Sequence, residues 1–204
     1  MIIGKLIKIS HKMVAHQMND NNKCLGFTLI EMLVTVAIAG ILLAISTPYF
    51  TEIITNNKTQ SYSSELSMAL FLAQNEAIKR GVQVTVKPNA TGTGYKWQGG
   101  WTIFSDNNGN GTQDGTDELI QSYADVDSAY TLKSKDSVFA SYVGFSATGS
   151  PLGIVSGVQA VSDGYLVLCR PDSDNNLSRI LSLTFAGNIR VSKGSVLSGV
   201  SLCQ

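Results

Sequence analysis

The longest apolar stretch of the chain runs from Phe27 to Thr47 and contains one charged side chain, Glu31. An α-helix rises about 1.5 Å per residue, so this stretch would be about 30 Å long as a helix. That length matches the hydrocarbon core of a bilayer. The pattern therefore predicts a helix that crosses a membrane once.

Helical periodicity continues after Pro48. A proline inside a helix removes one backbone hydrogen bond and clashes with the preceding turn, so we expect a kink at Pro48 and not an end. No glycine or proline occurs between residues 49 and 80. Apolar residues recur at spacings of three and four, at Tyr62, Leu66, Leu70, Ala73 and Ala77. The sequence thus predicts one long kinked helix over 27–80 whose second part is amphipathic.

Beyond Gly81 the period changes from helical to alternating. Val82, Val84 and Val86 alternate with polar residues, which is the pattern of a half-buried strand. Further short β-type segments are separated by Gly, Asn, Asp and Ser, and no second helix is indicated. These segments lie at 95–97, 101–104, 119–123, 130–132, 138–145, 164–169, 180–185 and 189–191. We therefore predict an α+β protein, in which the long helix packs on an antiparallel sheet or sandwich.

Glu31 needs a partner if it lies in a membrane. A carboxylate in hydrocarbon costs about 2.5–3.5 kcal/mol even on a lenient insertion scale. The apolar stretch offers no basic side chain. Cleavage of the peptide bond after Gly26 would create a positive α-amine on Phe27, four residues before Glu31. In a stack of such helices, the amine of one subunit could neutralise Glu31 of the next.

The segment Gly26-Phe27-Thr28-Leu29-Ile30-Glu31 ahead of the apolar helix resembles the processing site of type IV pilins and type II secretion pseudopilins. The resemblance implies cleavage by a prepilin peptidase between Gly26 and Phe27 and N-methylation of Phe27. It also implies that Glu31 aligns subunits in a filament. The alternative, an ordinary signal anchor with an incidental glutamate, does not explain these three residues together.

Four further segments are similar to the GspH/FimT branch of pseudopilins and minor pilins. They are a helix-to-strand junction, a Phe-x-x-x-Gly turn, a strand ending in Cys-x-Pro and a final hairpin, at 70–86, 144–149, 166–171 and 183–190. The resemblance implies a pilin-like fold and a filament subunit of a type II secretion system or a type IV pilus. Its partners would be other pilins, the prepilin peptidase, the inner-membrane assembly platform and membrane lipid.

This interpretation divides the chain into a cleaved leader, 1–26, a helix, 27–80, that crosses the membrane over 27–47, and a β-rich domain, 81–204. The leader holds four lysines and one aspartate. The positive-inside rule then places the N-terminus in the cytoplasm and the β-rich domain in the periplasm, as in a single-pass protein of the inner membrane. Met13 and Met18 are alternatives to Met1 as the translation start.

The three cysteines fit an oxidising compartment. Cys24 would leave with the leader, and Cys169 and Cys203 remain as a pair. A disulfide between them would close a loop of about 35 residues and stabilise the domain by about 3–4 kcal/mol on the chain-entropy model. The alternative is two free, buried thiols.

The composition argues against catalysis. Both histidines, His11 and His16, lie in the leader, so the processed chain would have none. This excludes Ser-His-Asp and Cys-His triads and the usual zinc sites. The formal net charge of zero becomes mildly acidic once the leader is removed, which does not favour nucleic acid as a partner. We expect a structural protein without a cofactor, not an enzyme.

One loop, 106–117, has spacing similar to that of a calcium-binding loop. Oxygen-bearing side chains occur at alternate positions, with a glycine at the sixth and an acid at the twelfth. The candidate calcium ligands are Asp106, Asn108, Asn110, Asp114 and Asp117. The final glutamate of such loops is absent and no helices flank the loop, so a polar β-hairpin loop is the alternative.

The final hairpin raises a second functional hypothesis, a DNA-binding minor pilin for natural transformation. Some FimT-type minor pilins bind DNA through a Gly-Arg-x-Arg turn, and this chain has Gly187-Asn188-Ile189-Arg190 at the matching place, with one arginine missing. The candidate DNA contacts are Arg179, Arg190 and Lys193. Three phosphate contacts supply little affinity, so a solvated strand face is the alternative.

Overall fold

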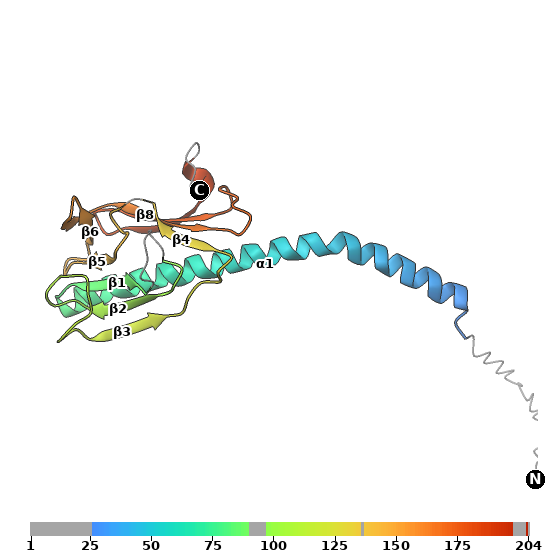
Figure 1. Cartoon of the computed structure of the whole chain (residues 1–204), viewed down its shortest axis with the longest axis horizontal. Helices are drawn as coiled ribbons and strands as arrows, with labels where there is room; N and C mark the ends of the chain where they lie inside the picture. The colour runs from blue at the N-terminus through green and yellow to red at the C-terminus, as the bar shows by residue number, and fades with distance from the viewer. Residues whose placement is uncertain (1–25, 90–96, 136, 198–202, 204) are drawn as a thin grey trace, which may run out of the picture. The chain divides into compact units, whose positions relative to one another are not determined.

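The structure, a computed structural model, describes residues 26–89, 97–135, 137–197 and 203. The chain forms two compact units that divide between Ser46 and Thr47. Helix α1, Leu29–Arg80, contributes residues to both units (Figure 1). It continues through position 48, so Pro48 does not end the helix, as predicted. The predicted kink itself stays a prediction.

In the first unit, the described residues form the apolar start of α1. This helix is long and apolar enough to cross a membrane, and none of its most apolar segment is buried within the protein. Leu29 and Leu43, for example, are 82% and 70% exposed. A helix with this much apolar surface requires a bilayer or neighbouring helices around it.

The second unit combines the remainder of α1 with two antiparallel sheets. One sheet has six strands in the order β3-β2-β1-β5-β6-β7, and the other has four in the order β10-β9-β8-β4. The first contains β1 (Val84–Pro88), β2 (Trp101–Ser105), β3 (Leu119–Tyr123), β5 (Val143–Phe145), β6 (Pro151–Val155) and β7 (Val158–Val161). The second contains β4 (Thr131–Ser134), β8 (Gly164–Cys169), β9 (Arg179–Leu183) and β10 (Ile189–Lys193).

The core of the second unit lies where α1 meets both sheets (Figure 1). The helix contributes the fully buried side chains of Leu66, Ala69, Leu70, Ala73 and Ala77. Four of these are the apolar positions that the periodicity predicted. Trp101 and Ile103 of the larger sheet and Leu166 and Leu168 of the smaller sheet belong to the same cluster. The amphipathic part of the helix therefore positions both sheets.

Gln74 of α1 forms hydrogen bonds to one turn from each sheet. Its Nε2 donates hydrogen bonds to the backbone oxygens of Gly149, at 2.8 Å, and Gly187, at 2.7 Å. A Cβ on Gly187 would lie 2.7 Å from the Gly149 oxygen, and its φ is +84°, so this turn requires glycine. The contact explains why Gly149 ends the Phe-x-x-x-Gly turn and why Gly187 lies in the turn of the final hairpin.

The strand predictions were wrong in two regions. A single strand was predicted over 138–145, but only Val143–Phe145 is a strand. Phe139 lies in a turn instead, with its ring in the core. Its carbonyl accepts a hydrogen bond from Trp97 Nε1. The β6–β7 hairpin was not predicted. Its turn residues, Ser156 and Gly157, both have positive φ, as a two-residue hairpin turn requires.

Two smaller differences concern short segments. Of the predicted strand at 95–97, residues 95 and 96 lie outside the described residues, and Trp97 is not in a strand. The sequence indicated no second helix, whereas the structure has one turn of 3₁₀-helix, η1 (Gly194–Leu197), after β10. The α+β class, with one long helix on antiparallel sheets, is confirmed.

Candidate functional site

The predicted processing site lies immediately before α1. Gly26 and Phe27 are outside the helix and exposed, and a Cβ on Gly26 would meet no atom within 4 Å. Phe27 is 78% exposed. No described side chain therefore covers the bond between these two residues.

Thr28 and Glu31 form a reciprocal cap at the start of the helix. The backbone N–H of Glu31 donates to Thr28 Oγ1 at 3.2 Å, and the backbone N–H of Thr28 donates to Glu31 Oε2 at 3.5 Å. This is a capping box, which satisfies two N–H groups that a helix start leaves unpaired. Thr28 was not among the predicted site residues, although Thr-x-x-Glu before an apolar run is the signal for this cap.

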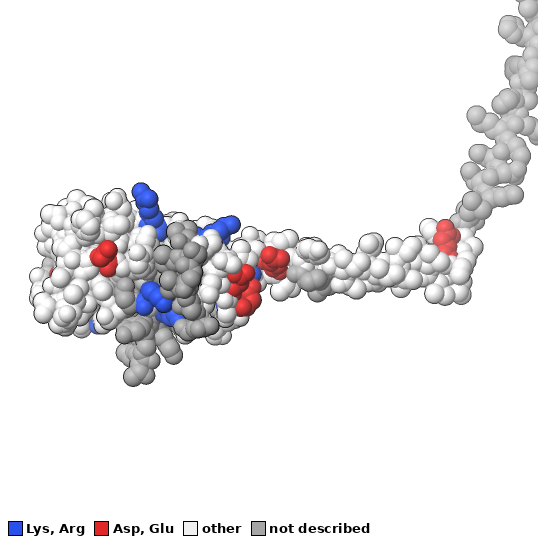
Figure 2. All heavy atoms as spheres, turned by 90° about the horizontal axis from the view of Figure 1, so that it is seen from above, with Lys and Arg blue, Asp and Glu red and all other residues white. Residues whose placement is uncertain are grey.

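The carboxylate of Glu31 has no cationic partner among the described residues of the first unit. The described residues of that unit, 26–46, contain no lysine or arginine. Figure 2 shows this part of the helix as an uncharged surface with one acidic group. The predicted contact of Glu31 with the α-amine of another subunit stays a prediction.

In the second unit, Cys169 and Cys203 form the predicted disulfide. Their sulfur atoms are 2.14 Å apart and their Cα atoms 5.6 Å apart. Cys169 ends β8 and packs with Val167, Ile180 and Cys203 in a small apolar cluster separate from the main core. Because side chains alternate along a strand, this cluster lies on the outer face of the four-stranded sheet, whereas Leu166 and Leu168 face the helix. The disulfide thus ties residue 203 to that outer face.

Arg170, the middle residue of Cys-x-Pro, anchors the strand end to the helix. Its guanidinium is buried and donates from Nε and Nη2 to the two carboxylate oxygens of Asp172, at 3.1 Å and 2.7 Å. Nη1 donates to Oδ1 of Asn56 in α1. The hydrogen bonds from Arg170 hold the pKa of Asp172 below its ordinary value. The sequence analysis did not single out Arg170 or Asn56. The two residues are 114 positions apart in the sequence, so no local pattern indicates their contact.

Asp106 is the buried centre of the predicted calcium loop. Its carboxylate accepts hydrogen bonds from the backbone N–H groups of Asn110, at 3.0 Å, and Gly111, at 2.9 Å. It also accepts from Gln83 Nε2, at 2.9 Å, and Thr85 Oγ1, at 2.8 Å. These four donors satisfy the carboxylate within the protein and attach the loop to β1.

The other acids of the loop are held in the same way. Asp117 accepts hydrogen bonds from the backbone N–H groups of Asn107 and Asp114, and Asp114 accepts from the amides of Asn108 and Asn110. Within the parts of the chain that the structure describes, no three acidic, histidine or cysteine side chains are grouped as metal ligands. The loop connects β2 and β3, as the β-hairpin alternative predicted. Calcium binding stays a prediction.

The three predicted DNA contacts do not lie together. Arg190 lines a cleft on the outer face of the four-stranded sheet, whereas Arg179 and Lys193 line a different depression beside Gln60 of α1. Arg179 and Lys193 are directly opposite each other on β9 and β10, and Lys193 is three residues from Arg190, so it projects to the other face. In the view of Figure 2, basic and acidic groups are interspersed on the globular unit. DNA binding stays a prediction that these placements do not favour.

Helix α1 carries a second apolar face in the second unit. Met68, Phe71 and Ile78 are 61%, 43% and 53% exposed. At 100° per residue they lie on the side opposite Leu66, Ala73 and Ala77, which face the core. Two further exposed side chains, Phe50 and Ile53, precede Met68 and Phe71 by five full turns and so share this face. We call these five residues the outer stripe.

An exposed apolar anchoring helix, capped at its start, and a domain whose helix supports two antiparallel sheets together define a membrane-anchored pilin-like subunit. The family model described as type II transport protein GspH matches residues 63–187, and the prokaryotic N-terminal methylation motif matches residues 21–47. The chain belongs to the GspH family. It is a minor pseudopilin or minor pilin, a subunit that assembles with other pilins.

The fold is similar to that of a solved minor pilin. Two crystal forms of the type IV minor pilin FimU from Pseudomonas aeruginosa superpose with TM-scores of 0.52 and 0.50, at 21% and 20% identity. The matches cover 68% and 67% of this chain and 91% and 94% of FimU. The minor pseudopilin EpsH from the type 2 secretion system of Vibrio cholerae matches with a TM-score of 0.46 at 12% identity, over 67% of this chain and 97% of EpsH. No curated protein matches the chain.

Proposed function

We propose that this chain is a subunit of the filament of a type II secretion system or a type IV pilus, in which it takes a structural and not a catalytic part. In this proposal a prepilin peptidase cuts between Gly26 and Phe27, Phe27 is N-methylated, and an inner-membrane assembly platform transfers the subunit from the membrane into the filament. The observation that carries the proposal is the amount of apolar surface that α1 leaves uncovered in both units.

In the first unit, this surface surrounds the helix. Before assembly, lipid would cover it, and in a filament the helices of neighbouring subunits would replace the lipid. Because hydrocarbon and leucine side chains are similarly apolar, such a transfer costs little, and close packing then decides the geometry. The same helix therefore suits both a membrane anchor and a filament core.

In the second unit, the outer stripe extends the apolar contact beyond the membrane. Its two apolar groups, Phe50 with Ile53 and Met68 with Phe71, are separated on the same face by Asn57 and by two small residues, Ser61 and Ser64. Small residues allow helix backbones to approach closely. We infer that the outer stripe packs against the helix of an adjacent subunit while the opposite face holds the sheets.

Glu31 supplies the register of this packing. The cap uses one carboxylate oxygen, Oε2, through a long hydrogen bond from Thr28. An α-amine on Phe27 of the adjacent subunit would neutralise the remaining charge, which is costly in an apolar environment. A one-turn slip of the helices would separate the two charges, so the contact favours one axial position.

The charges of the predicted leader support one orientation of the chain in the membrane. Four lysines precede the apolar helix, which the positive-inside rule places in the cytoplasm, with the second unit in the periplasm. The disulfide between Cys169 and Cys203 fits that oxidising compartment.

Intact mass with N-terminal fragmentation of the membrane-extracted protein tests the proposal. We expect a chain that begins at methylated Phe27 and that is absent when the prepilin peptidase is deleted. Gly26→Leu should leave the leader attached, whereas Gly40→Leu, at a glycine inside the helix with open space around it, should be processed normally. An uncut wild-type chain, or one cut at another bond, would contradict the proposal.

A further inference from the structure

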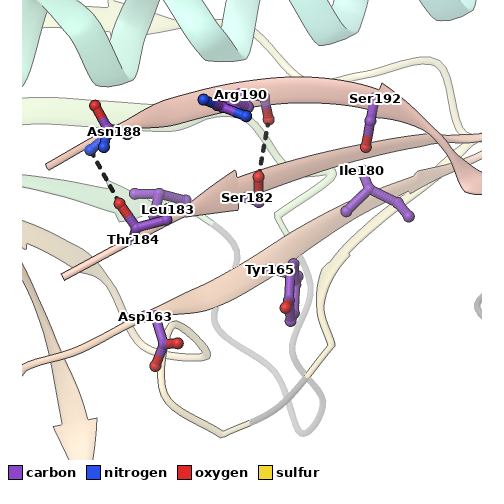
Figure 3. A pocket seen from close by; sticks show the side chains of 9 residues that line it. All are labelled: Asp163, Tyr165, Ile180, Ser182, Leu183, Thr184, Asn188, Arg190 and Ser192. Carbon is purple, nitrogen blue, oxygen red and sulfur yellow. Dashed lines mark hydrogen bonds between the residues drawn. The ribbon is translucent and has the colours of Figure 1, made fainter. Parts of the chain in front are cut away.

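The outer face of the four-stranded sheet carries an open cleft of about 470 Å³ (Figure 3). Its polar lining includes Asp163, Tyr165, Ser182, Thr184, Asn188 and Arg190. The cleft is on the face opposite the helix, so it is separate from the outer stripe and from the apolar surface used in the proposed assembly.

Strand pairing places three of these residues in one row. Arg190 of β10 is opposite Ser182 of β9, and Ser182 is opposite Tyr165 of β8 (Figure 3). Directly paired residues project to the same face of a sheet. With neighbouring strands about 4.8 Å apart, Arg190 and Tyr165 are separated by about 10 Å. The row therefore spans the cleft from the edge strand to the second strand inside it.

A second row closes one end of the cleft. Ile189, Leu183 and Gly164 are paired across the same three strands, so their neighbours Asn188, Thr184 and Asp163 form the next row on the outer face. The other end is closed by Ile180, which belongs to the apolar cluster of the disulfide. The cleft is thus polar at one end and apolar at the other.

The two charged side chains of the cleft are available to bind a ligand. Arg190 and Asp163 are exposed, and neither side chain has a hydrogen-bond or ion-pair partner in the described part of the chain. The ring of Tyr165, two residues after Asp163, is 37% exposed. The cleft therefore presents a hydrogen-bond donor, an acceptor and an aromatic surface on the same face of the sheet.

This combination suits a neutral ligand that both donates and accepts hydrogen bonds. A polyanion would gain from Arg190 but be repelled by Asp163, and Arg179 and Lys193 are on the other side of the sheet. A peptide added as a strand to the edge of β10 would not reach Tyr165, which lies two strands inside the sheet.

We propose that this cleft binds a neutral oligosaccharide. Sugar hydroxyls would donate to the carboxylate of Asp163 and accept from the guanidinium of Arg190, while Ser182, Thr184 and Asn188 supply further hydrogen bonds. The apolar face of a sugar ring would cover the exposed ring of Tyr165. The span of the row accommodates two sugar rings.

Saturation-transfer NMR tests this with the full chain in a detergent that carries no sugar head group. The probe is tetra-N-acetylchitotetraose, a neutral tetrasaccharide, and a short DNA duplex serves as the polyanionic competitor. We expect transfer to the sugar protons, and about tenfold weaker binding for Arg190→Gln and for Asp163→Asn, because each removes a charge-assisted hydrogen bond. Lys193→Gln, on the same edge strand but the other face, is the matched control and should bind as the wild type does.

The salt dependence gives an independent readout. Binding of a neutral sugar should change little between about 0.05 and 0.5 M salt, whereas phosphate contacts weaken steeply over that range. No transfer to the wild-type protein, equal binding by all variants, or displacement by DNA with equal loss in Arg190→Gln and Lys193→Gln would overturn the proposal. None of these results would affect the proposed filament function, which does not use the cleft.

Discussion

The hydroxyl of Thr28 accepts the backbone N–H of Glu31, and the carboxylate of Glu31 accepts the backbone N–H of Thr28. Glu31 therefore caps its own helix, a role that its charge alone would not reveal. In our proposal it also pairs with the amine of another subunit. Glutamine makes the same capping box without a charge, so substitutions can separate the two roles.

We predict that Glu31→Gln retains the helix start but strongly reduces incorporation into filaments. Thr28→Ala should do the reverse, destabilising the start of α1 by about 1 kcal/mol with the filament contact intact. Co-purification with sheared filaments measures incorporation, and amide hydrogen exchange near Met32 measures the cap. Equal loss of incorporation in both variants would show that the cap, and not the charge, is what assembly requires.

Leu70 and Phe71, consecutive residues of α1 of which one is buried and one exposed, should respond differently to substitution. Leu70 is fully buried, so Leu70→Ala should lower the free energy of unfolding by about 2–5 kcal/mol. Phe71→Ser, on the outer stripe, should change it by less than about 0.5 kcal/mol but weaken incorporation into filaments. The buried Trp97 and Trp101 report unfolding by fluorescence. Normal incorporation of Phe71→Ser would remove the outer stripe from the proposed interface.

The loop at 106–117 should depend on Asp106 whether or not calcium is present. Asp106→Ala leaves four donors without their acceptor, and we expect a loss of stability of about 2–4 kcal/mol. The loss should be the same in chelator and in millimolar calcium. Asp114→Ala, at an exposed position, is the control and should cost less. Stabilisation of the wild type by calcium that Asp106→Ala abolishes would instead support the predicted metal site.

The pair of Arg170 and Asp172 should make stability depend on pH. Arg170 lowers the pKa of Asp172 in the folded protein, so the carboxylate contributes stability above its unfolded pKa of about 3.9. That contribution is lost as the pH falls through the lowered, folded pKa. The difference in unfolding free energy between wild type and Asp172→Asn should therefore shrink between about pH 5 and pH 2. In an Arg170→Gln background the difference should be small throughout.

Loss of the disulfide should destabilise the second unit. On the chain-entropy model, Cys203→Ala removes about 3–4 kcal/mol, and reduction of the wild type should have the same effect. Cys24→Ala, in the leader, is the matched control and should leave the unfolding midpoint unchanged. If reduction shifts the unfolding midpoint of the wild type and of Cys203→Ala equally, the loss of stability on reduction does not come from this disulfide.

Elements that depend on local pattern were predictable. The spanning helix follows from a long apolar run, and the core face of its second part follows from spacings of three and four. The disulfide follows from Cys169 and Cys203, the two cysteines outside the predicted leader. The β6–β7 hairpin was missed because its turn, Ser156-Gly157, lacks the usual Asn-Gly or Asp-Gly signal.

The sequence by itself therefore determined the anchoring helix, the N-terminal methylation motif and the fold class, because each depends on neighbouring residues along the chain. Only the tertiary structure decided which distant side chains meet. Strand register separated Arg190 from Lys193 and set Arg190 in a row with Tyr165. Packing turned Asp106 inward onto donors of β1 and joined Arg170 to Asn56 of the helix. Strand order and register are long-range properties, and one residue of shift moves a side chain to the opposite face.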